Sequence, residues 1–240
     1  MTKAVTALVT VVALASCGTG IDHPFPAELT VFAAASLEPA FDRIARKVDA
    51  TTTFNFAGTQ VLTAQLTQGA KADVFASADS AHMEAVQQAG LLVGSPQVFA
   101  HNKLEIAVEK GNPKGIHSLQ DLARPGLVIV LADSSVPAGK YAQLALSKAG
   151  VTVHPVSLET QVTTVVTRVA LGEADAGIVY VSDIVTSGKV DGVPIPDSQN
   201  VVADYFIGDV SDRPAAHTFI DYVLSPGGQA IMAAAGFEKV

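Results

Sequence analysis

The chain is poor in cysteine, tryptophan and charged residues. Its 240 residues include one Cys and no Trp, and 16% of them are charged. A single Cys leaves no partner for an internal disulfide, so the fold must depend on its apolar core. With 49% hydrophobic residues the chain can bury such a core, which argues against disorder and allows one large domain or two small ones.

Clusters of basic residues are also missing. Fifteen Lys and Arg against 23 Asp and Glu give a formal net charge of −8. A nucleic-acid-binding protein should show a basic patch, so nucleic acid is not an expected partner. The acidic balance does not exclude an anion as ligand, because the backbone N–H groups at a helix start supply local positive potential.

The apolar run near the N-terminus is too short to cross a membrane. It covers the eleven residues 4–14 and follows Lys3, whereas a bilayer needs about 20 apolar residues. It suits the hydrophobic region of a signal peptide. Small residues and then Cys17 follow directly, which resembles a bacterial lipoprotein signal: removal of residues 1–16 would leave Cys17 to be lipidated, with residues 17–27 as a tether. The alternative is an ordinary signal peptide that happens to contain a Cys.

From Leu29 onward, β-rich runs alternate with amphipathic helical patterns. Apolar residues recur at helical spacing over 37–48 and again over 162–170. The expected strands are 29–34, 52–56, 73–76, 104–109, 127–132, 152–155, 176–181 and 205–208. Such alternation predicts an α/β fold with largely parallel strands.

Several expected strand-to-helix junctions carry small or hydroxyl residues. We expect Ser36 and Thr160 to cap helices, with Pro39 in the first turn of one of them. Gly58 and Thr59 precede another helix, and 137–139 lead into a fourth. Each junction alone is an ordinary helix start. Together their N–H groups and hydroxyls could surround an anion without a counter-charge.

The same segments resemble the periplasmic molybdate-binding proteins, the solute receptors of ABC importers. The similarity runs from about residue 29 to residue 237. Its most specific parts are TVFAAASL (30–37), GAKADVFASAD (69–79), VPAGKYA (136–142) and GIVY (177–180). KADVFASAD and GEADAG occur across several receptors for anions and organic solutes and support the fold, whereas AAAS, VPAG and the spacing to GIVY point to molybdate.

The resemblance implies a set of donors for the oxyanion. Ser36 and Thr59 would donate from their hydroxyls, Ala138 and Val162 from their backbone N–H groups, and Tyr180 from its phenol. Thr59 departs from the family, which usually has Ser there. A fully ionised dianion needs donors only, so neutral donors select against anions that still carry a proton, such as hydrogen phosphate.

The resemblance also implies the architecture and the partners. The fold would be a type II two-lobed receptor, each lobe a mostly parallel sheet flanked by helices and joined by two crossing strands. Lobe 1 would comprise 28–105 and 206–240, and lobe 2 would comprise 106–205. The expected protein is a monomer without cofactor, held at the outer face of the cytoplasmic membrane by its lipid. It would bind molybdenum only as molybdate, bind tungstate as well, with the preference between the two left open, and deliver its ligand to an ABC permease.

Other functions find less support. The six His residues are dispersed without metal-ligand spacing, and no GxSxG elbow is present, so an enzyme is not expected. The segment around Gly139 and Lys140 does not match the phosphate-binding P-loop motif. Ser134 stands where the motif requires Gly, and Tyr141 stands where it requires Ser or Thr. A regulatory effector module would need a DNA-binding segment in place of the signal peptide. A receptor for sulfate, phosphate or an organic acid remains the alternative.

Overall fold

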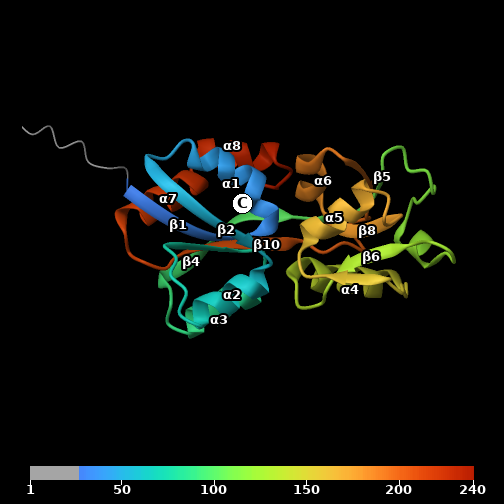
Figure 1. The fold of residues 1–240 in the computed structure, drawn as a ribbon, viewed down its shortest axis with the longest axis horizontal. Coiled ribbons are helices and arrows are strands. Elements are labelled where there is room, and N and C mark those ends of the chain that lie inside the picture. Colours follow the sequence, from blue (N-terminus) through green and yellow to red (C-terminus); the bar gives the residue numbers. More distant parts are fainter. Residues whose placement is uncertain (1–26) are drawn as a thin grey trace, which may run out of the picture.

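The computed structural model describes residues 27–240, which form two α/β lobes joined by crossing strands (Figure 1). Each lobe is built on a five-stranded sheet. The predicted signal peptide, the predicted lipidation site Cys17 and all but the last residue of the predicted tether lie outside the described residues. Within the described part, every helix is too short or too polar to cross a membrane.

The sheet of lobe 1 has the strand order β2-β1-β3-β10-β4. β1 is parallel to β2 and β3, and β10 is antiparallel to β3 and β4, so four strands run one way. The strands are β1 (Ala27–Ala34), β2 (Ala50–Ala57), β3 (Val74–Ser77), β4 (Val93–Asn102) and β10 (Ala203–Asp209).

Helices cover both faces of this sheet because its strands bury side chains on both sides. Leu29, Val31 and Ala33 of β1 belong to one apolar cluster, and Phe32 belongs to the other. The covering helices are α1 (Glu38–Ala45), α7 (Pro214–Leu224) and α8 (Pro226–Ala234) on one face, and α2 (Thr59–Thr67) and α3 (Ser80–Gln88) on the other (Figure 1). A 3₁₀ turn, η1 (Ala35–Leu37), links β1 to α1.

Lobe 2 repeats this plan with the strand order β7-β6-β8-β5-β9, in which β5 alone is antiparallel to its neighbours. The mostly parallel sheets predicted from the sequence are therefore confirmed. The strands are β5 (Leu104–Glu109), β6 (Ile129–Ala132), β7 (Ser157–Glu159), β8 (Ala176–Tyr180) and β9 (Val190–Pro194), and the helices are η2 (Leu119–Ala123), α4 (Pro137–Ala149), α5 (Val162–Ala170) and α6 (Val181–Ser187).

The chain crosses between the lobes twice, and the two crossings are bonded to each other. β4 ends at Asn102 in one sheet and β5 begins at Leu104 in the other. On the return, the Asn200 side chain accepts from the Leu104 N–H at 3.1 Å and donates to its carbonyl at 2.9 Å. Sheet membership thus changes a few residues before the boundaries expected at 105 and 206. The division into two independently moving lobes stays a prediction.

Three strand assignments differ from the prediction. The strand expected at 152–155 is wrong: pairing with β6 begins only at Ser157, after Pro155, which has no N–H to donate. β4 and β9 were not predicted. β4 contains Gly94 and Pro96, which obscure the pattern, and it tolerates the proline because it forms the edge of its sheet.

Candidate anion-binding site

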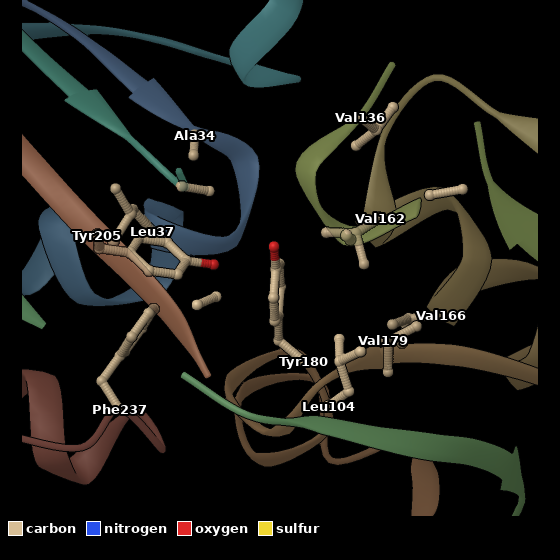
Figure 2. Close-up of a cluster of buried hydrophobic side chains, with 14 of the residues drawn as sticks. Ala34, Leu37, Leu104, Val136, Val162, Val166, Val179, Tyr180, Tyr205 and Phe237 are labelled. Atoms are coloured by element: carbon tan, nitrogen blue, oxygen red, sulfur yellow. The ribbon is translucent and has the colours of Figure 1, made fainter. Parts of the chain in front are cut away.

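The five residues singled out from the sequence line one small cavity between the lobes. They are Ser36, Thr59, Ala138, Val162 and Tyr180, and the cavity has a volume of about 20 Å³. In Figure 2 the ring of Tyr180 stands between the two lobes, with lobe 1 on one side and lobe 2 on the other. The tertiary structure therefore brings together residues that lie up to 144 positions apart in the chain.

Three of these residues stand in the first turn of a helix. Thr59 and Val162 are the first residues of α2 and α5, and Ala138 is the second residue of α4, after Pro137. First-turn N–H groups have no partner within the helix. None of the three preceding N-cap residues forms a side-chain hydrogen bond to them. These helix starts therefore keep donors available to a ligand at the cavity.

The helix caps expected at Ser36 and Thr160 were wrong. Ser36 lies inside η1, and Gln161 occupies the N-cap position of α5. The Ser36 hydroxyl is hydrogen-bonded to the hydroxyl of Tyr205 at 2.9 Å instead. The reason is that β1 passes into a 3₁₀ turn before α1 begins, which turns Ser36 toward the crossing strand β10 and away from the N–H groups of the helix.

The Tyr180 hydroxyl is the clearest sign of a ligand. Tyr180 ends β8 and is 1% exposed, yet its hydroxyl oxygen has no hydrogen-bond partner among the described residues. An unpaired buried hydroxyl costs about 1–3 kcal/mol. Burial holds the pKa of this phenol well above its ordinary value. The phenol therefore keeps its proton and can donate a hydrogen bond to a ligand.

The Thr59 hydroxyl, like that of Tyr180, is arranged so that it can donate to a ligand. Its oxygen accepts the N–H of Ala78 at 3.3 Å. Ala78 directly follows β3 within the KADVFASAD stretch, so this motif fixes the orientation of Thr59. With its oxygen engaged as an acceptor, the Thr59 hydroxyl retains its own proton for a ligand.

Sequence reasoning missed three residues around the cavity. Tyr205 contacts Ser36, as described above. Asp183 is buried at the start of α6, where its Oδ2 accepts the N–H of Tyr180 at 3.0 Å, and burial raises the pKa of its carboxyl to about 7. The Gln60 side chain donates to the Thr160 carbonyl at 3.0 Å, which joins the two lobes beside the cavity. No local pattern marks Tyr205 or Gln60, because each acts through a partner distant in sequence.

Gly139 fixes how α4 approaches the cavity. A Cβ at this position would overlap the carbonyl oxygens of Ala132 and Asp133, both backbone atoms that cannot rotate away. We expect Gly139→Ala to lower the free energy of unfolding by about 1–3 kcal/mol, the usual cost of overpacking. Urea unfolding measures it. Gly227→Ala is the matched control, because the added methyl would meet the ends of the Tyr222 and Ser225 side chains and no backbone atom at overlapping distance. An equal effect of the two substitutions would contradict this close-packing role.

A second group of ionisable side chains lies on lobe 1, away from the cavity lining. The Nε2 of His217 is 2.8 Å from an Asp209 oxygen and 3.3 Å from an Asp212 oxygen. No metal-ligand spacing in the sequence marks this group. Since His217 and Asp212 are exposed, we interpret the group as surface ion pairs.

Comparison with known proteins adds the family context. The model of the bacterial extracellular solute-binding protein family matches residues 29–238. The molybdate-binding protein ModA of Mycobacterium tuberculosis is 42% identical over 245 residues, which cover 95% of this chain and 94% of that protein.

Two solved structures share the fold. The periplasmic molybdate-binding protein of Azotobacter vinelandii superposes with a TM-score of 0.76 at 22% identity, covering 87% of this chain and 98% of that one. The sulfate-binding protein SubI of Mycobacterium tuberculosis gives the same TM-score at 18% identity, covering 89% of this chain and 87% of that one. Because receptors for two different oxyanions superpose equally well, the fold alone does not choose the ligand.

Proposed function

The chain belongs to the bacterial extracellular solute-binding proteins, and from that membership we propose that it is a molybdate receptor that delivers its ligand to an ABC importer. The observation that carries the proposal is the buried hydroxyl of Tyr180, which has no hydrogen-bond partner within residues 27–240 and faces a cavity lined by helix starts. The ligand class follows from the donors at that cavity. The choice of molybdate follows from the 42% identity to a molybdate-binding relative over nearly the whole chain.

The cavity offers donors and no cation. Hydroxyls of Ser36, Thr59 and Tyr180 and the N–H groups of Ala138 and Val162 would hold the oxygens of the anion. Each is neutral, and an oxygen of a fully ionised dianion can accept from all of them. Hydrogen phosphate carries an O–H group that needs a hydrogen-bond acceptor, and the cavity presents donors. Burying that O–H without an acceptor would weaken the binding of hydrogen phosphate.

The anion would bind between the lobes, because the small cavity is lined by residues of both. The hydrogen bond from the Gln60 side chain of lobe 1 to the Thr160 carbonyl of lobe 2 holds the closed arrangement. Closure around an anion would create the surface that the importer recognises.

We also propose that the protein acts outside the cytoplasm and has no catalytic role. The donors at the cavity include no nucleophile paired with a base, so we propose a receptor without enzymatic activity. We further propose that Cys17 carries a lipid, that the protein acts as a monomer, and that tungstate binds as molybdate does, because the two anions match in charge and nearly in size.

A thermal-shift titration tests the ligand. We expect molybdate and tungstate to raise the melting temperature of the purified protein, because a ligand at a hundred times its Kd stabilises the folded state by about 2.7 kcal/mol. Sulfate and phosphate at the same concentrations serve as controls and should change it little. If sulfate alone raised the melting temperature, the ligand would be sulfate and not molybdate. If none of the four anions raised it, a tetrahedral oxyanion would not be the ligand.

A further inference from the structure

Tyr205 lies directly behind the cavity and is not among the residues that line it. It stands on β10 beside the crossing between lobes and is 0% exposed. Its ring packs edge-on against Tyr180 at 5.8 Å and against Phe237 at 5.2 Å between centroids. Figure 2 shows its hydroxyl directed toward the Tyr180 side of the cluster. This packing fixes the ring, and so it fixes where the hydroxyl can donate.

The bond between Tyr205 and Ser36 has two possible directions, since either hydroxyl can be the donor. Each hydroxyl has one proton. If Ser36 donates to Tyr205, no proton of Ser36 remains for an anion, and Ser36 can only accept from a ligand. If Tyr205 donates to Ser36, the Ser36 proton is free to point into the cavity.

We propose, resting on the proposed function, that Tyr205 is a positioning residue that donates its proton to Ser36 Oγ and thereby commits the Ser36 hydroxyl to donate to the anion. The chemistry of the two groups favours this direction, because a phenol O–H is a stronger hydrogen-bond donor than an aliphatic hydroxyl and the serine oxygen is the better acceptor. Among the described residues, the hydrogen bond that the Tyr205 hydroxyl forms is the one to Ser36 Oγ, at 2.9 Å.

Tyr205 therefore contributes to specificity as well as to affinity. A Ser36 hydroxyl held as a donor repels a ligand proton, so it disfavours hydrogen phosphate relative to a fully ionised dianion. Without the Tyr205 hydroxyl, Ser36 can rotate and accept as well as donate. The selectivity between molybdate and phosphate should then decrease.

A double-mutant cycle on the full chain tests this role by isothermal titration with molybdate. We expect Tyr205→Phe, which keeps the packed ring, to raise the Kd for molybdate about tenfold, a change equivalent to about 1.4 kcal/mol. In a Ser36→Ala background the same substitution should change the Kd by less than about twofold, because the hydroxyl that it positions is gone. Tyr222→Phe is the matched control and should leave the Kd unchanged.

The outcomes separate this inference from the proposed function. An equal loss from Tyr205→Phe in both backgrounds would overturn the inference alone, since the loss would then be structural. No loss in either background would overturn it as well, provided that the parent protein binds. If the parent bound no tetrahedral oxyanion, the proposed function would fall and the inference with it. The selectivity, measured as the Kd for phosphate divided by the Kd for molybdate, should also decrease in Tyr205→Phe. A loosened core alone does not predict this decrease.

Discussion

Replacing Tyr180 with Phe is expected to weaken molybdate binding by about 1–3 kcal/mol, or roughly 5- to 150-fold in Kd. The Tyr180 hydroxyl is buried without a partner among the described residues, so the substitution removes a donor that only a ligand would satisfy. The unliganded protein should lose no stability, because no internal hydrogen bond is broken, and it should gain a little as the orphan hydroxyl disappears. Isothermal titration and unliganded urea unfolding measure the two effects.

Two further variants show whether this loss belongs to the hydroxyl. Tyr222→Phe removes a phenol from α7, which does not line the cavity, and should leave the Kd unchanged. Val162→Ala should lower stability, because the side chain is only 5% exposed, while it leaves the Kd nearly as it was, because the proposed donor is the backbone N–H. Unchanged affinity in Tyr180→Phe would remove Tyr180 from the site.

Replacing Asp183 with Asn is expected to change how stability depends on pH. In the folded protein burial raises the pKa of this carboxyl to about 7, whereas in an unfolded chain an Asp titrates near pH 4. Between these values the folded state binds one more proton than the unfolded state. The parent protein therefore loses stability from this group as the pH rises from about 4 to about 7, and the loss levels off above.

The amide that Asp183→Asn introduces cannot ionise but still offers an oxygen to the Tyr180 N–H. The variant should thus match the parent near pH 4 and exceed it above pH 7, by a difference on the order of 3–4 kcal/mol. Urea unfolding across this pH range measures the difference, and other titrating groups cancel because both proteins contain them. Asp42→Asn on the exposed side of α1 is the control for replacing a carboxylate with an amide. A constant offset for Asp183→Asn would mean that the carboxyl ionises normally.

Local sequence patterns predicted a helix or strand correctly where the apolar residues of that one element showed a clear periodicity or run. The apolar positions 162–170 match α5, and the run 104–109 matches β5. The prediction failed where pairing partners decide. The 152–155 run has strand-like residues but finds no neighbour until Ser157 pairs with β6, and β4 forms despite Gly94 and Pro96 because β10 lies beside it.

The five predicted site residues illustrate the same division. Their types could be read from the chain because helix starts with small or hydroxyl residues, and a tyrosine at a strand end, recur in a family whose ligand is an anion. Their convergence on one cavity is a result of the fold, which places the helix starts of both lobes opposite each other. Their role as donors to molybdate stays a prediction that the titrations above test.

The sequence by itself determined the α/β alternation, the mostly parallel sheets and the anion-receptor class, because these depend on short-range periodicity and on motifs of a few residues. Only the tertiary structure decided which hydroxyl has a partner and which, within the described residues, has none. Ser36 bonds to Tyr205 across 169 positions, and Tyr180 is left without a bond. Hydrogen-bond partners and burial are properties of atoms brought together from distant parts of the chain, so no stretch of sequence contains them.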